Sequence, residues 1–90
     1  MNIPWDLVFD LLYKWLDSCG DTEEARVAAI RRRPFAVRVR VTQALRKAGL
    51  AGDELREARR EVIDEIQSAT DDELRAFAVG GPQAVLDLDK

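Results

Sequence analysis

Apolar and polar residues alternate along this chain with the period of an α-helix. In the most regular stretch, apolar residues recur at steps of three and four from Leu55 to Ala69 and form a narrow seam. Proline, glycine and capping residues separate such stretches from one another. The pattern predicts four main helices and a shorter fifth, at residues 4–19, 22–32, 35–48, 53–69 and 71–79.

Polar residues and one proline mark where these helices begin and end. Asp21 is the expected N-cap of the second helix, and Asp53 that of the fourth. Pro34 should separate the second helix from the third, because the residue before a proline is pushed out of the helical conformation. Thr70 and Glu73 have the spacing of a capping box, which predicts the start of the fifth helix.

Residues 35–41 also fit a β-strand, because apolar and polar residues alternate there and several are β-branched. No second strand is visible to pair with this segment, and the helical period continues to Ala48, so we favour a helix. The expected fold class is therefore all-α, a small compact bundle of four main helices plus a short fifth helix. We expect one helical domain at residues 1–82 and a C-terminal tail at residues 83–90, which has little to fix it in place.

The first helix is unusually apolar. Its apolar residues leave only a narrow polar stripe, so the apolar arc covers roughly 240°, where a surface helix needs little more than about 100°. Either the other helices enclose this helix or part of its arc contacts another protein. If it is enclosed, the expected core spine is Trp5, Val8, Leu12, Trp15 and Leu16. If part of it is open, the candidate protein-contact residues are Trp5, Leu7, Phe9, Leu11 and Trp15, and an isologous homodimer is the favoured use.

Charge is strongly segregated along the chain. Between Ala25 and Gly52 there are eight positive charges and no carboxylate, whereas both flanking segments are acidic, so the net charge of −3 conceals the contrast. The basic segment can pair with the acidic segments inside the fold or face a polyanion outside it. For internal pairing, we expect several arginines to meet carboxylates of the first or fourth helix, namely Arg26, Arg31, Arg32, Arg38 and Arg40. For a polyanion such as nucleic acid, the candidate contacts are Arg31, Arg32, Arg33, Phe35, Arg38 and Arg46.

Two further observations bear on nucleic-acid binding. Phe35 could stack on a base, but we favour its packing against the first or second helix near Pro34. Residues 44–58 resemble a helix-turn-helix unit in their spacing. Asp53 and Glu54 would open the reading helix, however, and carboxylates disfavour docking between phosphates.

The sequence contains no constellation typical of catalysis or of cofactor binding. Histidine is absent, and Cys19 is the only cysteine, so a Cys/His zinc site and an internal disulfide are excluded. We expect no enzyme activity, no cofactor, no membrane span and a cytoplasmic location. The favoured function is a small helical protein-interaction module that self-associates through its first helix. The alternative is a nucleic-acid-binding or regulatory protein that uses residues 26–47.

Overall fold

The computed structural model describes residues 3–81, which fold into five helices. These are α1 (Trp5–Asp17), α2 (Glu23–Arg32), α3 (Pro34–Lys47), α4 (Gly52–Ser68) and α5 (Asp71–Gly80). Residues 3–81 contain no strand, and residues 35–41 are helical. The predicted all-α fold is confirmed, and every helix ends within two residues of its predicted bounds. The predicted tail at residues 83–90 lies outside the described residues.

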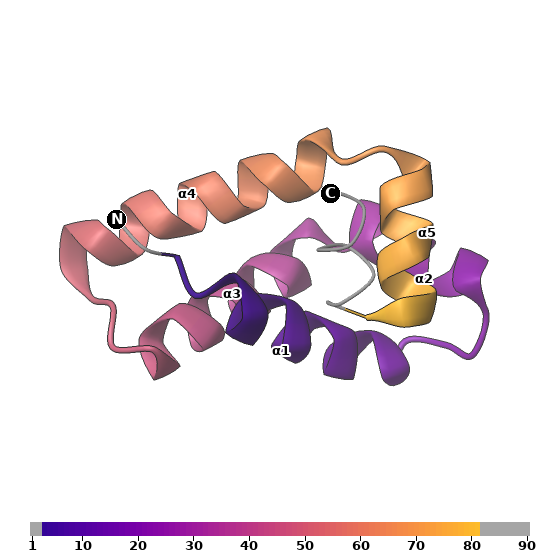
Figure 1. Cartoon of the computed structure of the whole chain (residues 1–90), viewed down its shortest axis with the longest axis horizontal. Helices are drawn as coiled ribbons and strands as arrows, with labels where there is room; N and C mark the ends of the chain where they lie inside the picture. The colour runs from indigo at the N-terminus through magenta and orange to yellow at the C-terminus, as the bar shows by residue number, and fades with distance from the viewer. Residues whose placement is uncertain (1–2, 82–90) are drawn as a thin grey trace.

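The helices form a chain of packed pairs rather than a bundle in which every helix meets every other. α1 packs on α3, α3 packs on α4, and α2 packs on α5. In Figure 1, α4 runs along the top and α1 along the bottom with α3 between them, while α2 and α5 close one end. α4 therefore depends on α3 for most of its packing.

The observed N-caps agree with the sequence for α5 and differ for α2 and α4. Thr70 and Glu73 form the predicted capping box, with both hydrogen bonds at 3.1 Å. The cap of α2 is Thr22, not the predicted Asp21, because the Thr22 hydroxyl accepts a hydrogen bond from the Ala25 N–H. The prediction for Asp53 was also wrong. α4 starts one residue earlier, so Asp53 lies in its first turn, where the helix dipole favours a carboxylate.

A Schellman motif ends α3 and turns the chain back along it as α4. Gly49 adopts φ +96°, a left-handed conformation that favours glycine. The Leu50 N–H donates to the Leu45 carbonyl at 3.1 Å, and the Gly49 N–H donates to the Arg46 carbonyl at 2.9 Å. This turn brings Arg38 of α3 beside the arginines of α4.

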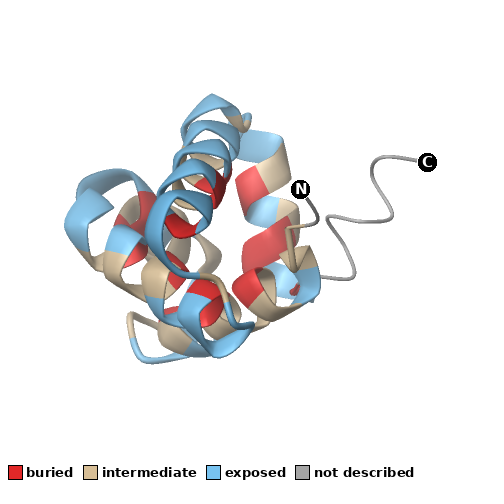
Figure 2. Ribbon diagram, turned by 90° about the vertical axis from the view of Figure 1, so that its left-hand side faces the viewer, coloured by how far each residue is buried: buried red, intermediate tan, exposed pale blue. Residues whose placement is uncertain are grey.

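The core lies along the inward faces of the helices, where the buried positions gather in Figure 2. α1 contributes Val8, Leu12 and Leu16 to it, which confirms three residues of the predicted spine. α3 supplies the facing row, which consists of Val37, Val41, Ala44 and Leu45.

The prediction that both tryptophans belong to the buried spine was wrong. Trp5 and Trp15 are half-buried and pack against the edge of the core. Trp5 stacks on Phe9, with ring centroids 5.5 Å apart, and the Arg40 guanidinium lies 6.0 Å from the centre of a Trp15 ring. Trp5 lies at the N-terminal end of the core face of α1, and Trp15 lies at the side of that face next to α3.

Candidate functional site

Arg26 is committed to internal contacts. Its side chain is 13% exposed, and its guanidinium pairs with Asp17 at 2.9 Å. The same group donates to the Gly20 carbonyl at 3.0 Å and to the Ala78 carbonyl at 2.9 Å. Arg26 therefore fastens the end of α5 to the end of α1 and is not available to an outside partner.

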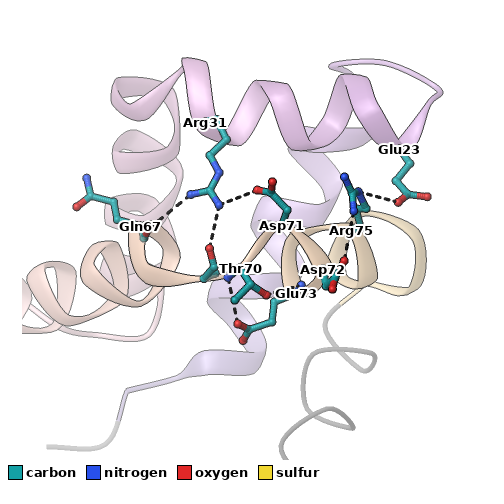
Figure 3. A network of polar contacts seen from close by, with 9 residues as sticks. Glu23, Arg31, Gln67, Thr70, Asp71, Asp72, Glu73 and Arg75 are labelled. Atoms are coloured by element: carbon teal, nitrogen blue, oxygen red, sulfur yellow. Dashed lines mark hydrogen bonds and ion pairs between the residues drawn. The ribbon is translucent and has the colours of Figure 1, made fainter.

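Arg31 is likewise engaged within the fold, at the junction of α4 and α5 (Figure 3). Its guanidinium donates to the Ala69 carbonyl at 2.9 Å and pairs with Asp71 at 3.0 Å. A second ion pair, between Arg75 and Glu23 at 3.6 Å, also joins α5 to α2. Through these contacts α2 holds both α5 and the segment that joins α5 to α4.

The expectation that several basic-segment arginines pair with carboxylates of the first or fourth helix was largely wrong. Only Arg26 does so, and Arg31 pairs with a carboxylate of α5 instead. Within residues 3–81, Arg32, Arg38 and Arg40 make no ion pair. The physical reason lies in α4, which places arginines and not glutamates beside Arg38 of α3.

The two flanks of α4 carry opposite charge. Its buried seam consists of Leu55, Ala58 and Val62, with the half-buried Ile66 next in line. Each residue immediately before a seam position is a glutamate, so these carboxylates share one flank. The residues that follow the first two seam positions, Arg56 and Arg59, lie on the other flank.

Four arginines gather where this second flank meets α3, and we call them the arginine surface: Arg38, Arg56, Arg59 and Arg60. They line a depression of about 280 Å³ together with Ile63 and Asp64. The Arg59 guanidinium donates to the Thr42 hydroxyl of α3 at 3.5 Å. Arg56 pairs with Asp53, and both groups are exposed.

Phe35 lies one helical turn before Arg38 and is 77% exposed. The prediction that it packs against the first or second helix was wrong. It precedes the buried Val37 by two residues, which places it about 200° around α3 from that core position. The same spacing places it on the side of α3 that carries Arg38 and Thr42.

A second hollow lies on the other side of α4, between that helix, α1 and α5. We call it the groove, a cavity of about 330 Å³. Its lining is apolar apart from two carboxylates, Glu65 and Glu73. Aromatic rings form one wall, where Phe9 lies 5.6 Å from Phe77 between ring centroids. The full lining is Trp5, Phe9, Leu12, Ile30, Val37, Glu65, Ile66, Ala69, Glu73, Leu74 and Phe77.

The structure divides the predicted protein-contact residues between two stripes of α1. Trp5 and Phe9 line the groove. Leu7, Leu11 and Trp15 are spaced by four residues and follow the opposite flank, where Trp15 meets Arg40 of α3. All five are half-buried, so α1 does not present a fully exposed apolar face.

The predicted polyanion contacts are also divided. Arg38 belongs to the arginine surface and Phe35 lies beside it, whereas Arg31 is held at the α4–α5 junction. The remaining three, Arg32, Arg33 and Arg46, are exposed, make no ion pair with any residue in 3–81 and line neither hollow.

Sequence reasoning missed three arginines of α4 and both groove carboxylates: Arg56, Arg59, Arg60, Glu65 and Glu73. For Arg56, Arg59 and Glu65 the signal was present in the periodicity, because the two arginines follow seam positions and the glutamate precedes one. The net charge of a sequence segment combines the charges of both flanks of α4 and so hides this arrangement.

No protein-family model, curated protein or solved structure matches this chain. Among residues 3–81, no cluster of cysteine and carboxylate side chains has an arrangement that could hold a metal ion. None of the helices α1–α5 is long and apolar enough to cross a membrane. The described residues offer two surfaces for binding, the groove and the arginine surface.

Proposed function

We propose that this protein is a non-enzymatic protein-interaction module whose groove binds an amphipathic helix with basic flanking residues. The observation that carries the proposal is the groove itself, an apolar hollow of about 330 Å³ with two carboxylates in its lining. We also propose a cytoplasmic setting, because a single cysteine that remains a free thiol suits a reducing compartment.

The lining of the groove favours a helical protein segment as its occupant. A hollow between helices that is lined by large apolar side chains accepts apolar anchors projecting from a partner helix. Trp5 and Phe9 supply aromatic contact area, and tryptophan is enriched among the residues that dominate binding energy. Glu65 and Glu73 would pair with lysine or arginine beside those anchors, which selects a basic segment over an acidic one.

The test uses two fluorescent amphipathic peptides of about 14 residues, one of leucine and lysine and one of leucine and glutamate. We expect the leucine–lysine peptide to bind with micromolar affinity and the leucine–glutamate peptide to bind at least about tenfold more weakly. Fluorescence anisotropy measures both affinities. Glu65→Arg should weaken binding of the basic peptide, because it reverses a charge in the groove.

Glu61→Arg is the matched control, because it makes the same change in net charge at an exposed residue that lies outside the groove. Equal binding of the two peptides, or equal weakening by the two substitutions, would contradict the proposal. Light scattering tests the homodimer expected from the sequence. A dimer that the basic peptide dissociates would identify a second copy as the natural occupant and overturn the assignment to a separate helix.

A further inference from the structure

We propose that the arginine surface binds single-stranded nucleic acid, with phosphates over Arg38, Arg59 and Arg60 and a base stacked on Phe35. This site is separate from the groove, since the two hollows share no lining residue. The inference does not depend on the proposed protein-interaction function.

The first argument is the charge of the depression. Four guanidinium groups line it against one carboxylate, that of Asp64. Within residues 3–81, Arg38, Arg59 and Arg60 take part in no ion pair, and Arg56 shares its charge only with Asp53. Like charges held this close repel one another, and an anion that binds among them removes the repulsion.

The second argument is the chemistry of the side chains. All four basic groups are arginines, whose planar guanidinium matches the oxygens of a phosphate and can also stack on a base. Arg59 is already oriented by its contact with Thr42 at 3.5 Å. Arg38 comes from α3 and the other three from α4, so the positive charges follow the furrow between two helices.

Phe35 supplies the third argument. It is one of only two large hydrophobic side chains in residues 3–81 that are mostly exposed, the other being Val79. An exposed ring beside a row of arginines is the arrangement that single-stranded binders use, with a base on the ring and the backbone along the charges. Burying the ring under a base also removes apolar surface from water.

A single strand fits this surface better than a duplex or an anionic membrane does. Asp53 and Asp64 border the arginines on α4, and a wide duplex that covers the patch would bring phosphates against these carboxylates. A narrow strand that follows the furrow meets only Asp64, which lines the depression, and leaves Asp53 outside its path. A membrane-binding surface combines basic groups with several apolar side chains, whereas Phe35 is the one mostly exposed large hydrophobic residue on this side of α3.

The experiment measures the anisotropy of labelled oligothymidine and oligouridine, each of about 12 nucleotides, on titration with the full chain. If the arginine surface neutralises three or four phosphates, the affinity for the oligonucleotides should fall roughly 15- to 60-fold as the salt concentration rises from 50 to 200 mM. The double variant Arg38→Gln/Arg60→Gln should bind at least about tenfold more weakly. Phe35→Ala should lose about fivefold or more, because base stacking contributes that much, and Phe35→Leu should not restore the loss.

The matched control is Lys14→Gln/Lys47→Gln, which removes the same charge from exposed sites on α1 and on the opposite side of α3. It should retain affinity within about threefold at physiological salt. The proposal is overturned if this control binds as weakly as the arginine variant, or if neither oligonucleotide binds at 50 mM salt. It is equally overturned if a 12-base-pair duplex binds as well as the single strands, or if vesicles containing phosphatidylserine bind while the oligonucleotides do not. Circular dichroism of each variant verifies that its helices are intact.

Discussion

The groove and the arginine surface flank the same helix, yet their relation to the core of the protein differs. Leu12, Val37 and Phe77 line the groove and are also members of the buried core. The arginine surface contains no buried side chain, and three of its four arginines make no ion pair within residues 3–81. The groove is thus an extension of the packing that folds the chain, whereas the arginine surface is an addition to it. Substitutions should separate the two regions by their effect on stability.

The largest effect is expected at the floor of the groove. Leu12→Ala removes most of a side chain that is 4% exposed and leaves a cavity between α1 and α3. We expect the free energy of unfolding to fall by about 2–5 kcal/mol, measured by urea denaturation. Leu7→Ala, at a half-buried position on the same helix, is the control and should cost less. Unchanged stability of the Leu12 variant would show that the groove is not continuous with the core.

Arg26 provides the next test, because it holds the end of α5, one wall of the groove. Arg26→Met keeps much of the apolar stem but leaves the Gly20 and Ala78 carbonyls and the Asp17 carboxylate without their donor. We expect a loss of about 2–3 kcal/mol in thermal or chemical unfolding. Arg26→Lys should recover only part of it, because an ammonium cannot reproduce the fork of the guanidinium. Full recovery by lysine would show that charge alone matters at this position.

A smaller loss is expected at the start of α5. Thr70→Ala removes the hydroxyl that accepts the Glu73 N–H at 3.1 Å and opens the capping box. N-cap truncations of this kind cost about 1 kcal/mol. Hydrogen exchange should accelerate at the first amides of α5 and remain unchanged in α3. Uniform acceleration throughout the protein would indicate that α5 does not unfold locally.

The smallest effect is expected on the arginine surface. Arg38→Gln/Arg60→Gln should change the free energy of unfolding by no more than about 0.5 kcal/mol, since both side chains are exposed and make no ion pair within residues 3–81. Urea denaturation of this variant at low and high salt is the measurement. A loss above 1 kcal/mol would mean that these arginines support the fold, and the contrast between the two regions would fail.

The sequence predicted the helices well because their signals are local. Pro34 ends α2 by its own steric requirements, and the Thr70–Glu73 capping box forms within one turn. The tryptophans were harder to place. Trp15 is an apolar residue, but it lies at the edge of the core, where its ring faces Arg40 of α3.

The two surfaces were predicted only in part. Trp5 and Phe9 were identified as contact residues from the apolar arc of the first helix, and Arg38 and Phe35 from the basic segment. Their partners on α4 were not identified, because the acidic composition of that helix suggested an acidic surface. Tertiary packing of the seam that starts at Leu55 decides which flank of α4 meets α3.

The way α4 is attached has a consequence for the size of the groove. α4 packs on α3 but has no extensive contact with α1 or α5, so the opposite walls of the groove are not bonded to each other. A small rotation of the far end of α4, where Ala69 joins it to α5, changes the distance between these walls and leaves the α1–α3 packing intact. We therefore expect the groove to adapt its width to anchors of different volume, and Arg31, which binds both the Ala69 carbonyl and Asp71, to limit that adaptation.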